Sequence, residues 1–235
     1  SGTYVEDRFR NDWLLELGRR QDWANFAAEF PRFRMNDDRE VTCYGLLVDH
    51  LNGKDVGDDA LAAWLAQRDA DDGCAAMATT LRDARVFSTA NLWRKARYAV
   101  DASRPRAARQ AVALVSPSAA SAFDELLDNP ARYLARRASA AGRGGAELAT
   151  LALMRMAGND PDAAALLLSS RWERALPADL DAWAWSAIGK QAALALQPNA
   201  DDYFLRATKA AARSKVHIDW PDETLAWKAR AALRA

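Results

Sequence analysis

The segment Asp7–Phe30, DRFRNDWLLELGRRQDWANFAAEF, predicts two helices joined by a tight turn. In the first half, large apolar residues recur at a spacing that places them on one face of a helix. These residues are Phe9, Trp13, Leu14 and Leu17. Gly18, followed by two arginines, predicts the end of this helix. Asp22 then predicts the N-cap of a second helix whose apolar face carries Trp23 and Phe26.

Two short helices cannot bury their apolar faces alone, so this pair must pack against further helices. The rest of the chain repeats the pattern, with an apolar stripe after each capping residue or proline. Helix starts are predicted at Asp37 or Asp38, Asp58 or Asp59, Asp71 or Asp72, Ser88 or Thr89, Pro105, Ser116, Pro130, Ala146, Asp160, Pro177, Asn199 and Pro221.

The predicted fold is therefore all-α, a right-handed superhelical array (α-solenoid) of helical hairpins with about fourteen helices. No strict repeat period is present, which argues against a tetratricopeptide array. We expect residues 1–235 to form a single superhelical domain. The glycine-rich residues 142–145 are the expected position of a soft bend.

Composition excludes several classes of protein. The 235 residues contain 32 Lys plus Arg and 32 Asp plus Glu, and this balance gives no reason to expect a nucleic-acid partner. No apolar run is long enough for a membrane span. The chain contains nine tryptophans, for which burial between helices competes with stacking on carbohydrate. We expect Trp13, Trp23, Trp64 and Trp93 to be buried in the core.

A family resemblance is carried by one pattern of large and charged residues near the start of the chain. It comprises Asp7-Arg8-x-Arg10-x-x-Trp13-Leu14-x-x-Leu17-Gly18, then Asp22-Trp23-x-x-Phe26, with a cysteine in each of two later helices and the residues Phe87-Ser88 and Trp93-Arg94. This pattern resembles the superhelical domain of the soluble lytic transglycosylases, which are periplasmic enzymes that cleave peptidoglycan glycan strands. The resemblance is most specific in the first hundred residues.

The resemblance implies that this chain is a fragment of a larger enzyme. In that family a separate lysozyme-like domain carries the catalytic Glu, within a Glu-Ser motif that this sequence lacks. The parent would cleave the MurNAc–GlcNAc β-1,4 bond with a 1,6-anhydro product, without metal or cofactor. We therefore assign no catalytic residue and expect this chain alone to be inactive. The expected partners are the glycan strand and the catalytic domain of the same parent chain.

A second interpretation is a helical-repeat scaffold that binds a protein partner along a concave face. The Asp7–Phe26 pattern and the two cysteines favour the first interpretation. Continuation of the parent gene into a domain with a Glu-Ser motif would distinguish the two.

The two cysteines are Cys43 and Cys74. The periplasmic location that the resemblance implies favours a disulfide between them, and two buried free thiols are the alternative. A structural zinc site is not expected, because the sequence has no CxxC motif and its two histidines are far apart.

One cluster of basic residues is a candidate for contact with substrate. Arg132, Arg136 and Arg137 flank Tyr133 and Leu134 in one predicted helix. Such a face could meet the carboxylates of peptidoglycan stem peptides. The alternative is a solvated helix surface on which the arginine stems lie along apolar neighbours.

Overall fold

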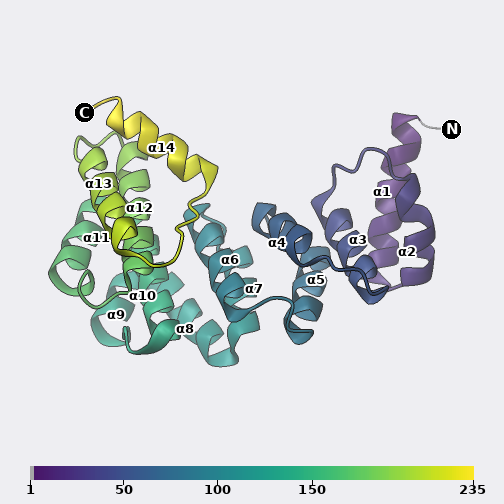
Figure 1. Cartoon of the computed structure of the whole chain (residues 1–235), viewed down its shortest axis with the longest axis horizontal. Coiled ribbons are helices and arrows are strands. Elements are labelled where there is room, and N and C mark those ends of the chain that lie inside the picture. Colours follow the sequence, from purple (N-terminus) through teal and green to yellow (C-terminus); the bar gives the residue numbers. More distant parts are fainter. Residues whose placement is uncertain (1–2) are drawn as a thin grey trace. The chain divides into compact units, whose positions relative to one another are not determined.

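The computed structural model describes residues 3–235, and these residues form helices and loops without a strand (Figure 1). The predicted all-α class is confirmed, and the described chain contains fourteen α-helices. Close contacts divide the chain into two compact units. Unit 1 runs to Lys95 and includes Arg106–Val115, whereas unit 2 consists of Ala96–Pro105 and Ser116–Ala235.

Unit 1 is built from successive short helices and the first part of α6. The helices are α1 (Tyr4–Arg19), α2 (Trp23–Glu29), α3 (Arg39–Leu51), α4 (Gly57–Ala66), α5 (Asp72–Asp83), α6 (Thr89–Asp101) and α7 (Pro105–Val115). Three aspartates begin helices as the sequence predicts. The side chains of Asp22, Asp38 and Asp71 each accept a hydrogen bond from the backbone N–H three residues further on.

The buried face of α1 differs from the predicted one. Phe9 is 71% exposed and Trp13 is 49% exposed, so these two side chains lie outside the core. Instead, Asp7 and Asn11 point inward with Leu14. The Asp7 carboxylate accepts hydrogen bonds from two backbone N–H groups of the link before α3, and the Asn11 amide donates to Asp38. These hydrogen bonds to the link turn the polar side chains of Asp7 and Asn11 inward, and the predicted apolar stripe is left partly exposed.

Gly18 lies one residue before the end of α1, as the sequence predicts, and it also has a packing role. Helix α1 continues to Arg19, and the chain turns at Gln21, whose φ is 57°. A Cβ atom on Gly18 would lie 2.5 Å from the ring of Tyr44. Gly73 on α5 is equally restricted, because its Cβ would lie 2.6 Å from a backbone oxygen of α3 and 3.0 Å from the same ring. Tyr44 of α3 therefore fills a slot between glycines of α1 and α5.

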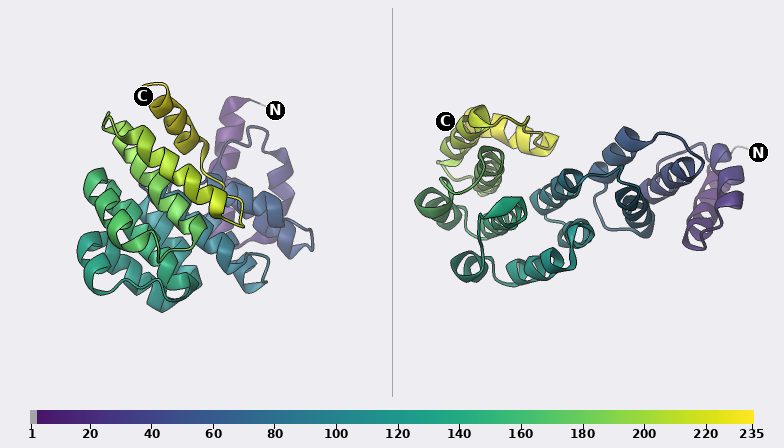
Figure 2. Two further views of the ribbon diagram at one scale, coloured as in Figure 1. Left: turned by 60° about the vertical axis from the view of Figure 1, so that its left-hand side comes forward. Right: turned by 60° about the horizontal axis from the view of Figure 1, so that its bottom comes forward.

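Unit 2 contains the end of α6 and seven further helices. These are α8 (Pro117–Asp128), α9 (Pro130–Arg136), α10 (Gly142–Ala157), α11 (Pro161–Leu167), α12 (Ala178–Leu194), α13 (Ala200–Arg213) and α14 (Asp222–Ala232), and α11 continues into a π-helical turn at Leu168–Trp172. Helix α12 is buried along nearly its whole length, and α13 lies alongside it (Figures 1 and 2).

Charged side chains are buried among the helices of unit 2. The Arg97 Nη1 lies 2.6 Å from a carboxylate oxygen of Glu147, whose side chain is 1% exposed. Arg143 bridges Glu147 and Asp179. It donates one hydrogen bond to Glu147 at 2.9 Å and two to Asp179 at 3.0 and 2.6 Å. A second site joins α6 to α12 and α14, because the Lys190 Nζ lies 2.9 Å from Asp101 and Thr224 donates to the same carboxylate. Buried charges of this kind are tolerated because each one is paired.

The glycine-rich residues 142–145 form the first turn of α10, inside unit 2. Gly142 has a φ of 73°, which favours glycine. A Cβ on Gly145 would lie 2.5 Å from the carbonyl oxygen of Ser139. These glycines therefore have a local geometric role, and the soft bend stays a prediction.

Two of the four tryptophans predicted to be core are fully buried. Trp64 and Trp93 are each 2% exposed, and the Trp64 ring stacks on Phe87 with a centroid separation of 5.3 Å. Trp23 is only half-buried at the edge of the core around Leu14 and Tyr44. The prediction is therefore wrong for Trp13 and only partly correct for Trp23.

The tight packing around Gly18 gives a testable prediction. Gly18→Ala should lower the free energy of unfolding by about 1–3 kcal/mol, because the new methyl group overlaps the Tyr44 ring. Helix propensity alone would change the free energy of unfolding in the opposite direction, because Ala is favoured over Gly by about 1 kcal/mol in a helix. Urea denaturation followed by circular dichroism would measure it.

The matched control is Gly57→Ala in the first turn of α4. A Cβ there would meet its nearest neighbour at 3.4 Å, an ordinary contact. We expect this variant to be as stable as the wild type or slightly more stable. Equal stability of the Gly18 and Gly57 variants would contradict the slot around Tyr44.

Candidate functional site

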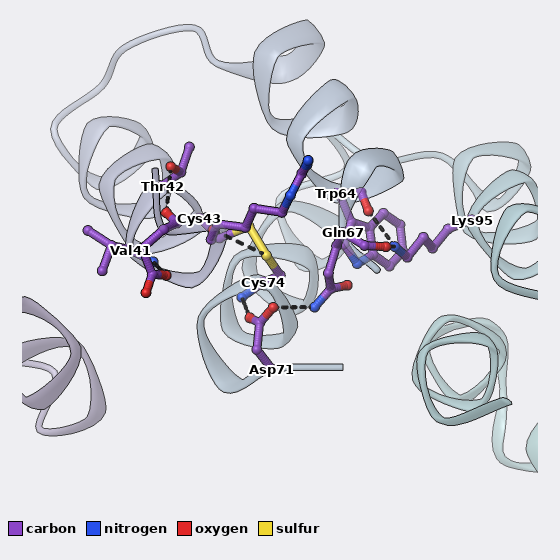
Figure 3. Close-up of a disulfide and its surroundings, with 10 residues drawn as sticks. Val41, Thr42, Cys43, Trp64, Gln67, Asp71, Cys74 and Lys95 are labelled. Carbon is purple, nitrogen blue, oxygen red and sulfur yellow. Dashed lines mark hydrogen bonds between the residues drawn. A yellow bond between two sulfur atoms is a disulfide. The ribbon is translucent and has the colours of Figure 1, made fainter. Parts of the chain in front are cut away.

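A disulfide joins Cys43 of α3 to Cys74 of α5, with the two Cα atoms 4.9 Å apart (Figure 3). Both cysteines are fully buried. Asp71 supports the bridge, because its carboxylate accepts a hydrogen bond from the Cys74 N–H at 2.7 Å. The pair therefore fixes α3 against α5 at the point where α5 begins.

Lys95 is a buried cation next to this region. Its ammonium group donates to the backbone carbonyl oxygens of Trp64 and Gln67 at the end of α4 (Figure 3). Burial lowers the pKa of Lys95 to about 8, against an opposing effect of Asp71. The lysine thus caps the C-terminal end of α4, where the carbonyl groups carry partial negative charge.

A groove lies beside the disulfide on the surface of unit 1. Two cavities of about 360 and 420 Å³ share Gln21, Trp23 and Ala76 in their walls. The first continues to Arg19, Tyr44 and Asp72, and the second continues to Leu47, Leu51, Ala75, Thr79 and Thr80. We call the combined feature the Trp23 groove. It lies over the α1–α2 turn, α3 and α5.

The polar groups of the Trp23 groove suit a hydrogen-bonding ligand. Tyr44 lines the first cavity but is 2% exposed, and burial raises its pKa to about 12. Arg19 and Asp72 supply opposite charges at the same end of the groove. The Trp23 ring meets the Tyr44 ring at a centroid distance of 6.0 Å and an angle of 46°. Pockets that bind small molecules commonly combine an apolar aromatic wall with a few placed polar groups.

Of the arginines that the sequence analysis singled out, Arg132 lies in the first turn of α9, Arg136 is its last residue and Arg137 is its C-cap. Arg132 and Arg137 are about two-thirds exposed and form ion pairs with Asp128 and Glu125 of α8 at 3.7 and 3.5 Å. Arg136 is also exposed, whereas Tyr133 and Leu134 are buried. The aromatic residue therefore does not belong to the exposed basic face, and contact of that face with substrate stays a prediction.

Unit 2 contains a carboxyl group with a strongly perturbed pKa. Burial raises the pKa of Asp181 to about 7, and the neighbouring Glu173 adds to the shift. A pKa in this range is typical of general acids. However, Asp181 is fully buried and lies 2.7 Å from the Arg213 guanidinium, so it cannot reach a substrate. Nothing in the sequence distinguishes this residue, because Asp181 lies in the first turn of a helix like many surface aspartates.

Within residues 3–235, no cluster of three metal-ligating side chains is found. Over the same residues, no helix combines the length and the apolar character needed to cross a bilayer.

The groove was missed by sequence reasoning. Trp23 was assigned to the core because it begins an apolar stripe, and Asp72 was interpreted as a helix-start residue. Both residues begin helices as predicted, Trp23 in α2 and Asp72 in α5, but Trp23 lies at the edge of the core and not inside it. The contacts of α3 with α2 and with α5 bring these residues to one surface.

Loss of the disulfide should destabilise the chain by about 3–4 kcal/mol, from the entropy of a closed loop with a sequence separation of 31. Urea denaturation with and without a reductant would measure the difference. The double variant Cys43→Ala, Cys74→Ala is the control, and its stability should not respond to the reductant. An unchanged midpoint for the reduced wild type would contradict this prediction.

Asp181 should make stability depend on pH. Its folded-state pKa is raised from 3.8 to about 7, so folding favours the protonated carboxyl. This contribution is complete below about pH 4 and is lost as the pH rises to about 7. The difference in unfolding free energy between wild type and Asp181→Asn should therefore change across this window and stay flat above it. A constant difference between pH 4 and pH 8 would exclude the shift.

No protein-family model matches the chain, and comparison with curated proteins finds no match. Among solved structures, an inactive mutant of the lytic transglycosylase Slt from Pseudomonas aeruginosa is similar over 97% of this chain, with a TM-score of 0.62 and 20% sequence identity. The similar region is 36% of the Pseudomonas chain, so this chain spans about a third of its length. The chain therefore has the fold of a helical segment of that transglycosylase.

Proposed function

We propose that this chain is the superhelical domain of a periplasmic soluble lytic transglycosylase. It would hold a peptidoglycan glycan strand beside a catalytic domain of the same parent chain. That catalytic domain would cleave the MurNAc–GlcNAc β-1,4 bond and form the 1,6-anhydro product. The observation that carries the proposal is the similarity of nearly the whole chain to part of a lytic transglycosylase. In this proposal residues 1–235 act as one domain of a larger enzyme.

The disulfide supports the proposed location. Disulfides persist in oxidising compartments such as the bacterial periplasm and are rare in the cytosol. The bond between Cys43 and Cys74 is fully buried and lies at the α3–α5 contact.

The buried carboxylates described above are not placed to act as the catalytic acid. Cleavage of a glycosidic bond needs an acid that reaches the glycosidic oxygen. Glu147 is enclosed by Arg97 and Arg143, and Asp101 is enclosed by Lys190 and Thr224. Their position inside the helical packing fits a structural role, as does that of Asp181. The exposed face with Arg132, Arg136 and Arg137 remains a proposed contact with stem-peptide carboxylates.

Isolated peptidoglycan sacculi test this proposal. The purified chain should sediment with sacculi but not with an equal mass of microcrystalline cellulose. Mass spectrometry of the supernatant should show no 1,6-anhydro muropeptides above a buffer control.

Two results would contradict the proposal in different ways. Failure to sediment with sacculi would remove the glycan-holding role and would favour a protein-binding scaffold. Release of 1,6-anhydro products would show that this chain contains a catalytic acid.

A further inference from the structure

We propose that the Trp23 groove binds a neutral saccharide unit, with the Trp23 indole as the surface on which the sugar ring packs. The proposal rests on the proposed function for its natural ligand, a glycan strand. The groove itself is defined by residues of unit 1 alone.

The first argument is the position of the indole. Trp23 is half-buried, packs on Tyr44 and borders both halves of the groove. Trp64 in the same unit provides the contrast, because it is 2% exposed and its ring is stacked on Phe87. A half-buried indole combines a fixed orientation with an accessible apolar surface. The apolar C–H face of a pyranose ring is complementary to such a surface.

The second argument is the charge of the groove. Arg19 and Asp72 have opposite charges and line the same cavity. A ligand with a strong net charge would be attracted to one of them and repelled by the other. A neutral ligand with many hydroxyl and amide groups can hydrogen-bond to both, because the guanidinium donates and the carboxylate accepts.

The third argument is the supply of further hydrogen-bonding groups along the groove. Thr79 and Thr80 both line the second cavity. The Thr79 hydroxyl donates to the Ala75 carbonyl at 2.8 Å, which leaves its oxygen lone pairs as acceptors. Groups of this kind, spaced beside an aromatic wall, match the alternation of hydroxyl groups and C–H faces on a saccharide.

The fourth argument is that the α5 side of the groove is rigid and lined by small residues. Ala75 and Ala76 are small side chains, and their size leaves the space that the two cavities occupy. The helix that carries them is linked to α3 by the disulfide one residue earlier, at Cys74. A site held in its binding geometry loses less entropy on binding.

The test begins with the whole wild-type chain and soluble chitotetraose, a neutral tetrasaccharide of N-acetylglucosamine. The indole N–H resonance of Trp23 is assigned by its disappearance in Trp23→Phe. Titration with chitotetraose should shift this resonance in a saturable way and leave that of Trp64 in place. A Trp23 resonance that does not move would overturn the proposal without requiring any destabilised variant.

A blocking variant then tests the position of the site. Ala76→Gln places a larger side chain in the part common to both cavities and should weaken chitotetraose binding at least about tenfold. The matched control is Ala62→Gln, the same substitution at an exposed position of α4 outside the groove, and it should bind as the wild type does. Circular dichroism melting would confirm that both variants are folded. Equal binding by the two folded variants would overturn the proposal.

Sedimentation with sacculi separates this proposal from the proposed function. Binding of the wild type to sacculi and weaker binding of Ala76→Gln would support both. If both bind sacculi equally, the glycan-holding role stands and the groove proposal fails. If chitotetraose shifts Trp23 but sacculi are not bound, the groove proposal stands and the proposed function fails.

Discussion

The packing of an aromatic ring against a helical glycine is the contact on which both units depend. Tyr44 lies against Gly18 and Gly73, and Phe204 lies at 3.0 Å from the Cβ position of Gly189. In each case the ring belongs to one helix and the glycine to a neighbour. A side chain at the glycine would push the helices apart and open the core, since protein interiors have almost no spare volume. Short helices gain their stability from such contacts and not from their own propensity.

Buried charged side chains form further contacts between neighbouring helices. Lys95 meets the open carbonyl groups at the end of α4, and Lys190 meets the end of α6 through the Asp101 carbonyl and carboxylate. Arg97 connects α6 to α10 through Glu147. Removing one partner of such a pair leaves an uncompensated charge in the interior, which is costlier than the net value of the intact pair. Each interface therefore tolerates change only when both partners change together.

The sequence predicted the fold class and most helix starts because these depend on local chemistry. Asp38 and Asp71 cap their helices through atoms three residues away, so no other part of the chain is needed to recognise them. The buried face of α1 was predicted wrongly because it depends on the distant link before α3. Asp7 is drawn inward by backbone N–H groups at Arg34 and Met35, and Trp13 is left outside. The Trp23 groove was unpredictable for the same reason, as its walls come from four helices.

Lys95 also affects how sequences related to this one should be read. A hydropathy profile counts a lysine in the middle of an amphipathic helix as a mark of the solvent face. In α6 that lysine is 1% exposed, so such a profile would assign the wrong face of the helix to the solvent. An arginine at this position would need more space. Its planar guanidinium would also have to replace a compact ammonium group that now donates to two carbonyl oxygens. In a relative of this chain, the lysine and the end of the helix that corresponds to α4 should therefore be aligned as one feature, even where the surrounding apolar residues differ.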